Sequence, residues 1–279
     1  MTDQSEQIIQ GENINHEVTI FAEPIFHIGG FQITNSLFVS WAVVLLIVVV
    51  GIRVKRKINI IPGKIQNAFE IIIDKFLEVF DSVTSSREKS LKFFPLIFAF
   101  FVFILLNNWL GLLPGVGSVG EVVSEHGENT LIPFLRGGTA DLNTTLALAI
   151  IGVVASHILG ILSVGLFHHF NKFINVKAAI EIPGKVFKDP TIIIVNPIKI
   201  FVGLLEVVGE IAKVASLSFR LFGNIFAGEV LLVSISAILA FGLPIPFMFL
   251  EVLVGLIQAL IFAILILVYL TIHTTAEEH

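Results

Sequence analysis

The chain has 279 residues, of which 55% are hydrophobic and 14% are charged, with a net charge of −5 and no cysteine. Its apolar runs are longer than one soluble core could bury, so the composition excludes a water-soluble globular protein and indicates a polytopic membrane protein. The absence of cysteine also excludes disulfides and thiolate metal ligands.

Residues 1–36 are predicted to form an N-terminal segment outside the membrane. This segment is acidic and carries no Lys or Arg, so it lacks the positively charged start of a cleaved signal peptide. We therefore expect the first apolar segment to remain as an anchor. Residues 37–279 are then expected to form a single membrane domain.

Five apolar segments are long enough to cross a membrane. They are Phe38–Ile52, Phe93–Leu113, Leu142–Phe167, Ile192–Leu243 and Pro246–Ile272. Lys64–Val83 has apolar residues at helical spacing with acidic residues interleaved, which predicts an amphipathic helix on the cytoplasmic side. The glycine-rich residues 115–138 are predicted to be a flexible external loop. The predicted fold class is therefore an all-α polytopic membrane protein of about five membrane helices, two of them long, tilted and forming a hairpin.

Basic residues predict the orientation. Of the 17 Lys and Arg residues, nine lie between Arg53 and Lys92 and five between Lys172 and Lys199, whereas the loop 115–140 contains only Arg136. Loops rich in Lys and Arg stay on the cytoplasmic side. We therefore expect the N-terminus outside and the C-terminus in the cytoplasm, in a bacterial-type plasma membrane.

The fourth apolar segment is too long for one perpendicular crossing. About 40 helical residues extend roughly 60 Å, about twice the ~30 Å hydrocarbon core, so this segment must tilt, break or extend beyond the bilayer. At about 100° per residue, its polar side chains form one stripe within about 40° of a line, and Glu229 points about 180° away from Arg220. The stripe consists of Glu206, Glu210, Lys213, Arg220 and Asn224.

Arg220 stands near the middle of this segment. Arginine keeps its proton, and a fixed charge in mid-membrane is costly enough to indicate a function. The last segment presents Glu251 and Gln258 on one face, across a short turn at Pro244–Pro246. Carboxylates can pass protons along water chains, whereas a permanent cation repels protons. The pattern predicts ion translocation past an electrostatic barrier.

The local sequences around these residues are specific. SLSFRLFGNIFAGE, LIQALIFAILILVYL and the terminal EEH closely resemble subunit a of the F-type ATP synthase. The resemblance continues through PGKIQNAFE, NNWLGLLP and DLNTTLALA, so it covers nearly the whole chain outside the N-terminal segment.

The resemblance implies a stator subunit with two offset proton half-channels, beside a c-subunit ring whose carboxylates pass the essential arginine. Proton flow would be coupled to rotation and ATP synthesis, with no catalysis by this chain alone. Protons would enter near Glu229 and Glu251 and leave toward the cytoplasm near Glu206. By position, the proton-translocation residues are Arg220, Asn224, Glu229, Glu251, Gln258, Glu206, Ser216 and Asp141. The implied partners are the c ring, the b-subunit peripheral stalk, the rest of the complex and membrane lipid. No nucleic acid, cofactor or metal is expected.

The chain departs from some family members, which carry histidine at the position of Glu251 or of Glu229. This chain has glutamate at both positions. Two nearby carboxylates fit a proton relay, because one tends to hold a proton when the other is charged. A sodium-using variant also stays open.

Several polar residues also have a purely structural interpretation. Asp141, followed by Asn143 and Thr144, is typical of a helix N-cap, alongside the outer-channel role that the family suggests. Asn224 and Gln258 fit interhelical hydrogen bonding equally well. For Arg220 the structural alternative is snorkelling to the membrane surface, but in a straight helix that surface lies about 30 Å away, beyond side-chain reach.

The remaining titratable residues receive structural interpretations. Glu210 and Lys213, three positions apart, predict a mutually neutralising ion pair. His157 is expected to make a helix-packing hydrogen bond. His168 and His169, in a basic loop, are expected to be solvated.

The competing functional class is an independent secondary transporter or channel, in which intramembrane Arg and Glu bind a substrate. It predicts inverted repeats, and none is visible in the sequence. The sequence also has no HExxH, GxSxG or GxxxxGK[ST] motif, which argues against an intramembrane hydrolase and against ATP binding through a phosphate loop.

Overall fold

The structure, a computed structural model, describes residues 14–15, 22–56, 58–113, 116, 119–125, 128–167, 169, 192–239 and 242–275. The chain forms two compact units. The first unit comprises Met1–Ile60, Phe101–Thr145 and Arg220–Leu260, and the second comprises Ile61–Phe100, Leu146–Phe219 and Ile261–His279. Four long helices contribute residues to both units.

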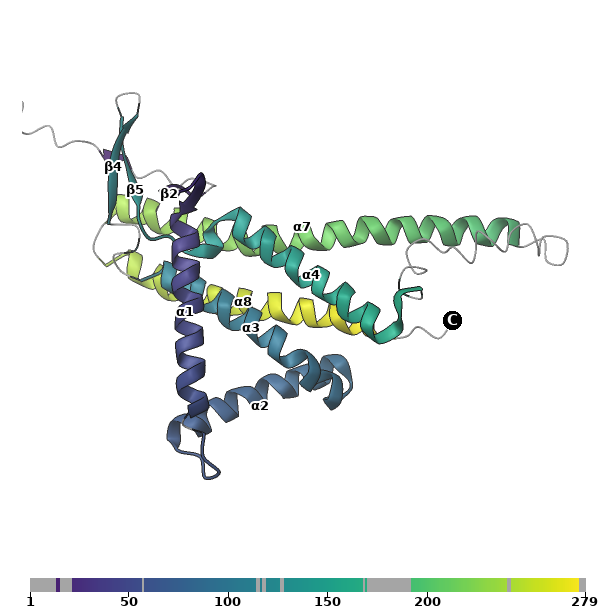
Figure 1. Ribbon diagram of the computed structural model, residues 1–279. Helices are drawn as coiled ribbons and strands as arrows, with labels where there is room; N and C mark the ends of the chain where they lie inside the picture. The colour runs from purple at the N-terminus through teal and green to yellow at the C-terminus, as the bar shows by residue number, and fades with distance from the viewer. Residues whose placement is uncertain are drawn as a thin grey trace, which may run out of the picture. The chain divides into compact units, whose positions relative to one another are not determined.

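Five of the described helices are long and apolar enough to cross a membrane. They are α1 (Asn35–Arg56), α3 (Arg87–Gly111), α4 (Leu142–Val164), α7 (Ile192–Ile238) and α8 (Pro244–Thr274) (Figure 1). The five predicted spans and the helical membrane fold are confirmed, with helix ends shifted by a few residues. The division into an N-terminal segment and a single membrane domain at residue 37 stays a prediction.

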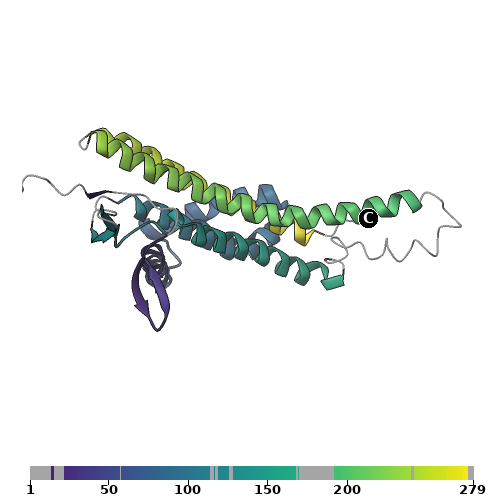
Figure 2. The ribbon, with the colours of Figure 1, turned by 90° about the horizontal axis from the view of Figure 1, so that it is seen from above.

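Helix α7 is continuous over 47 residues, although Pro197 lies within it. Both views draw it as a single uninterrupted helix (Figures 1 and 2). Because 47 residues extend about 70 Å at 1.5 Å per residue, a single crossing of a ~30 Å core requires tilt or extension beyond the bilayer. The alternative of a broken helix is excluded.

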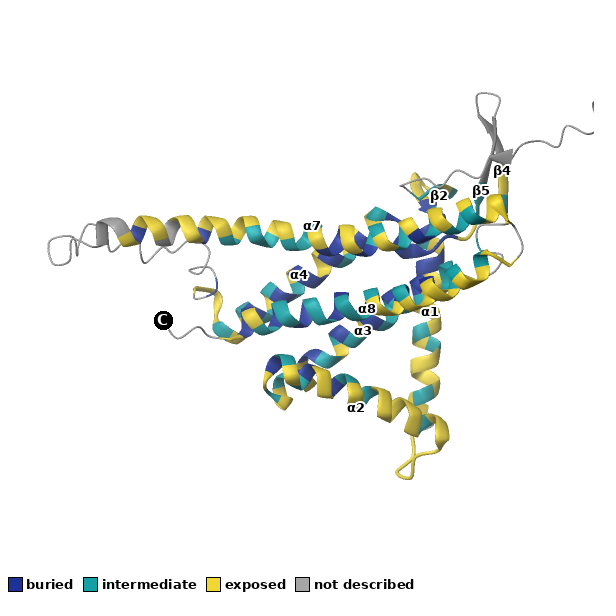
Figure 3. Ribbon diagram, turned by 180° about the vertical axis from the view of Figure 1, so that it is seen from behind, coloured by how far each residue is buried: buried dark blue, intermediate teal, exposed yellow. Residues whose placement is uncertain are grey.

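In the first unit, a hairpin precedes α1. Strands β2 (Pro24–Ile28) and β3 (Phe31–Thr34) pair antiparallel, and the turn uses Gly29 and Gly30 at φ values of 57° and 86°, which favour glycine. The buried residues of α1 all lie in its first half, namely Asn35, Ser36, Val39, Ser40 and Val43. The second half of α1 is largely exposed and coloured yellow in Figure 3.

The predicted flexible loop after α3 contains regular structure instead. Strands β4 (Gly120–Glu125) and β5 (Glu128–Pro133) pair antiparallel from Gly120 opposite Pro133 to Glu125 opposite Glu128, and β1 (Ile14–Asn15) lies parallel to β5. A buried 3₁₀ turn, η1 (Gly138–Ala140), follows. The loop prediction is wrong for these residues, because their backbone groups are paired in the sheet rather than left to solvent.

In the second unit, α2 (Lys64–Thr84) packs on the first half of α3. Phe76 and Phe98 meet edge to face at 5.4 Å between ring centroids, and Phe80 and Phe94 lie 5.8 Å apart. Leu77 and Phe80 are buried. The amphipathic helix predicted at Lys64–Val83 is confirmed.

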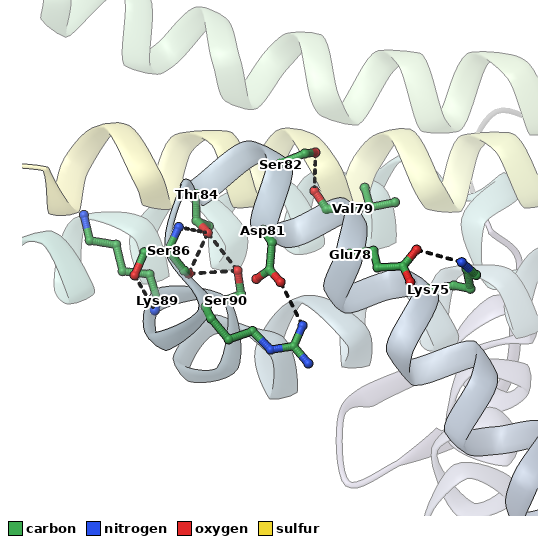
Figure 4. Close-up of polar contacts among 10 residues, drawn as sticks. Lys75, Glu78, Val79, Asp81, Ser82, Thr84, Ser86, Lys89 and Ser90 are labelled. Carbon is green, nitrogen blue, oxygen red and sulfur yellow. Dashed lines mark hydrogen bonds and ion pairs between the residues drawn. The ribbon is translucent and has the colours of Figure 1, made fainter.

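The turn from α2 to α3 is held by polar side chains (Figure 4). Ser85 ends α2 in the left-handed conformation, with φ of 53°, and Thr84 Oγ1 lies 2.7 Å from Ser90 Oγ. Arg87 donates to Asp81 at 2.8 Å. The nearby Ser90 hydroxyl, and then the hydrogen bond and charge of the Arg87 guanidinium, hold the pKa of the Asp81 carboxyl below its ordinary value.

Helices α4 and α8 pack closely in the second unit. At Gly152 an added Cβ would run into the side chain of Ile266, so the absence of a side chain permits the contact. The buried residues of α8 here include Ala263, Ile266, Leu267 and Leu270. This packing places Ser156 and His157 of α4 beside His273 near the end of α8.

Candidate functional site

Glu229 forms an ion pair within the first unit. Arg136 donates from Nε and Nη2 to Glu229 Oε2 at 3.3 Å and 3.1 Å. The Arg136 side chain is 4% exposed and that of Glu229 is 31% exposed. Sequence reasoning missed this role of Arg136, although the residue stands out as the single basic residue of its loop. The ion pair therefore ties the Glu229 carboxylate of α7 to the segment that follows β5.

Glu251 on α8 is buried in the same unit, with 6% of its surface exposed. An added Cβ at Gly228 of α7 would collide with the Glu251 carboxyl group. Gly228 directly precedes Glu229. Glu251 therefore meets α7 one residue before Glu229, where glycine makes room for the Glu251 carboxyl group.

A network of amide and hydroxyl groups holds α8 at this level. Asn108 of α3 donates to Gly255 O at 2.9 Å and accepts from Thr139 at 2.5 Å, while Trp109 donates to Val252 O at 3.1 Å. Asn108 and Thr139 are buried, and buried polar groups paired in this way fix the register of the helices. Asn108, Trp109 and Thr139 are positioning residues that the sequence motifs alone did not assign.

Asp141 caps α4. Its carboxylate accepts from the backbone N–H of Asn143 at 3.1 Å and from the Thr144 hydroxyl at 3.3 Å. The N-cap interpretation is confirmed, and the outer-channel role stays a prediction. Gln258 is half-buried on α8, two turns after Glu251.

Arg220 and Asn224 are exposed on α7 in the first unit. They begin a set of exposed residues at spacings of three and four, which we call the exposed stripe: Arg220, Asn224, Ala227, Leu231 and Ser234. The buried residues Leu221 and Gly228 lie about 90° around the helix. Exposed positions recur along α7 in Figure 3. The stripe thus differs from the face that packs on Glu251.

The second unit contains the other predicted residues of α7. Glu206 is half-buried and Ser216 is exposed. Lys213 Nζ lies 2.6 Å from Glu210 Oε1, which confirms the predicted ion pair.

The prediction of a solvated His169 is wrong. His169 is 6% exposed, and its Nε2 atom lies 3.1 Å from His157 Nδ1. The chain leaves α4 at Gly165, with φ of 91°, and His169 comes back to contact His157. His168 lies outside the described residues.

Comparisons with known proteins agree with this architecture. The family model described as "ATP synthase A chain" matches residues 37–271. The ATP synthase subunit a of Syntrophobacter fumaroxidans is 34% identical over 86% of this chain and 84% of its own length. That of Trichlorobacter lovleyi is 30% identical over 85% of each chain, and that of Geotalea daltonii is 32% identical over 85% of this chain and 86% of its own.

Proposed function

The chain belongs to the ATP synthase A chain family. We propose that it is the stator subunit of the rotary membrane motor and that the carboxylates of a c-subunit ring pass Arg220 as the ring turns. The family assignment makes the chain a proton-translocating membrane subunit of ATP synthase that is not catalytic by itself. Its five apolar helices make it a multi-pass membrane protein.

The observation that supports the role of Arg220 is its place on the exposed stripe of α7. Hydrocarbon does not solvate a permanent charge, so a stripe that includes arginine is suited to face protein or water. Ala227 and Ser234 are small, and small residues let another helix approach closely. A neighbouring helix with a carboxylate at the depth of Arg220 would satisfy both features.

The outer half-channel is proposed in the first unit. Glu251 contacts Gly228, the residue before Glu229, and Gln258 and Asp141 are the other residues assigned to this side. Protons would enter from outside near the two glutamates and load a ring carboxylate. Arg136 would hold the Glu229 carboxylate in place through its two hydrogen bonds.

The inner half-channel is proposed in the second unit, with Glu206 and Ser216 of α7 as its polar residues. A ring carboxylate that has lost its proton pairs with Arg220, while a protonated one moves on into lipid. The fixed charge therefore prevents a direct leak between the half-channels. The membrane potential supplies about 2.3 kcal/mol per charge per 100 mV.

The orientation and partners belong to the same proposal. Basic residues around α2 and before α7 favour a cytoplasmic side for these regions, with the N-terminus outside and the C-terminus in the cytoplasm of a bacterial-type plasma membrane. The b-subunit peripheral stalk, the rest of the complex and membrane lipid are the other proposed partners. Asn224, one turn after Arg220, would hydrogen-bond to the ring carboxylate as it arrives.

The test is ATP-driven proton pumping by the assembled complex in vesicles. We expect Arg220→Ala to abolish pumping while the c ring still co-purifies, because the ring carboxylate loses its cation. Arg53→Ala, at an exposed position near the end of α1, is the matched control and is expected to pump normally. Full pumping by Arg220→Ala, or a complex without a ring, would return the chain to the class of independent transporters.

A further inference from the structure

Two histidines and a glutamate converge in the second unit. His157 Nε2 of α4 lies 3.3 Å from Glu210 Oε2, and His273 Nε2 of α8 lies 3.3 Å from Glu210 Oε1. The three residues offer ligand atoms within 4.8 Å of one another. The two imidazole rings stack with centroids 4.5 Å apart. Three different helices thus direct nitrogen and oxygen donors to one point.

Hydrogen bonds set the tautomer of His273. The Ser156 hydroxyl has a single proton and donates it to Val153 O at 2.7 Å. The same hydroxyl oxygen lies 3.0 Å from His273 Nδ1, so at this contact Ser156 accepts and Nδ1 carries the hydrogen. In the neutral ring, Nε2 then bears a lone pair that faces Glu210.

His157 is supported in a similar way. Its Nδ1 atom is engaged with Nε2 of the buried His169 at 3.1 Å, which leaves its Nε2 atom toward Glu210. Histidines that bind metals almost always have the second ring nitrogen hydrogen-bonded, because this fixes the ring and its tautomer. Both histidines of the cluster therefore have the supporting contact that a metal ligand requires.

We propose that His157, Glu210 and His273 form a binding site for a divalent transition-metal ion of the zinc type. Zinc bonds of about 2.0–2.2 Å in a tetrahedron place neighbouring ligand atoms about 3.3–3.6 Å apart. His157 Nε2 lies 3.3 Å from Glu210 Oε2, and one ligand atom from each of the three residues lies within 4.8 Å of the others. Two imidazoles and one carboxylate suit zinc, with a water molecule as the fourth ligand. Without a cation, the Nε2 lone pair of the neutral His273 ring would face a carboxylate.

Lys213 limits the affinity of this site. Its ammonium group lies 2.6 Å from Glu210 Oε1 and 5.0 Å from the centre of the Tyr269 ring. Among the described residues, none donates a hydrogen bond to the buried Oε2 atom of Glu210, so this atom is available to the metal. A positive charge so close repels a dication. Removing it should strengthen metal binding.

The test measures metal bound to the whole synthase complex. The complex is treated with a chelator, loaded with zinc and freed of unbound ion, and bound zinc is counted by mass spectrometry. We expect one zinc ion per chain fewer in the His157→Gln/His273→Gln complex than in the native complex. His27→Gln, at an exposed position on β2, is the control and should retain the native zinc content.

Two further variants keep the test decisive if the double variant fails to assemble. Lys213→Met should bind cobalt, a spectroscopic substitute for zinc, at least tenfold more tightly. His169→Gln should bind it about 10–100-fold more weakly, because the supporting contact of His157 is lost. Equal zinc content in the native and double-variant complexes, equal losses in the His27→Gln control, or an unchanged affinity in Lys213→Met would each overturn the proposal. None of these experiments measures proton pumping, so the proposed metal site and the proposed proton path are tested independently.

Discussion

Two partly buried glutamates of helix α7, Glu229 and Glu210, have surroundings that differ in kind. In the first unit, Glu229 is paired with Arg136, which keeps its charge at every accessible pH. In the second unit, Glu210 is surrounded by Lys213, His157 and His273, and a histidine ring nitrogen can donate a hydrogen bond or bind a metal. The first carboxylate is therefore held by one arginine, and the second by a lysine and two imidazole rings. Spacing along a helix does not reveal this difference, because the partners come from other helices and loops.

The largest effect is expected when the positive charge of Arg136 is removed. We expect Arg136→Ala to destabilise the first unit by up to about 3 kcal/mol and to abolish most proton pumping, because a partly buried carboxylate is left without its cation. The measurements are the amount of chain in the purified complex and ATP-driven pumping in vesicles.

The double variant Arg136→Ala/Glu229→Gln is the control for this interpretation. The amount of this chain in the purified complex should return toward the native level, since a neutral amide needs no cation. Equal instability in the single and double variants would contradict the importance of the pair.

A smaller effect is expected where α7 meets Glu251. Gly228→Ala places a methyl group against the Glu251 carboxyl group, so we expect pumping to fall about tenfold, with the complex still assembled. Adding Glu251→Asp should restore part of the activity, because the shorter side chain leaves room for the methyl group. Gly51→Ala is the matched control, since nothing lies within 4 Å of that position. Equal pumping by Gly228→Ala and Gly51→Ala would refute the close contact.

The smallest effect is expected at the exposed pair of Asp81 and Arg87 in the second unit. This pair is the exposed counterpart of the Arg136–Glu229 pair. The pKa of Asp81 is lowered in the folded chain, so its contribution is present above the ordinary value of 3.8 and is lost as the pH falls through the folded pKa. Asp81→Asn should speed hydrogen exchange slightly at the α2–α3 turn near neutral pH. Native and variant chains should become alike at strongly acid pH, and a difference that grew on acidification would contradict this sign.

Much of the helical architecture could be predicted from the sequence. Long apolar runs predict membrane spans, and apolar residues at helical spacing in Lys64–Val83 predict an amphipathic helix. The sequence therefore predicts all five spans and α2. The β4–β5 hairpin was not, because six glycines between 115 and 138 favour an irregular loop. The pairing of residues 120–125 with 128–133 depends on backbone hydrogen bonds, which composition does not show.

The candidate site was predicted less completely. The Glu210–Lys213 pair and the Asp141 cap follow from spacings of two and three residues. Arg136 and Glu229 are 93 positions apart, and no periodicity connects them. His169 was also missed, because its burial depends on how the chain turns after Gly165. Sequence reasoning finds polar residues in membrane helices, and packing selects their partners.

The most direct measurement is cross-linking between single cysteines, for which the cysteine-free chain is well suited. Cysteine would be placed at Asn224, Ala227 or Leu231 of the exposed stripe, or at the exposed controls Phe249 and Leu253 of α8, opposite a cysteine beside the ring carboxylate. We expect disulfides to the c subunit from the stripe and none from α8. Cross-links from α8 with none from the stripe would contradict the proposal that Arg220 faces the ring.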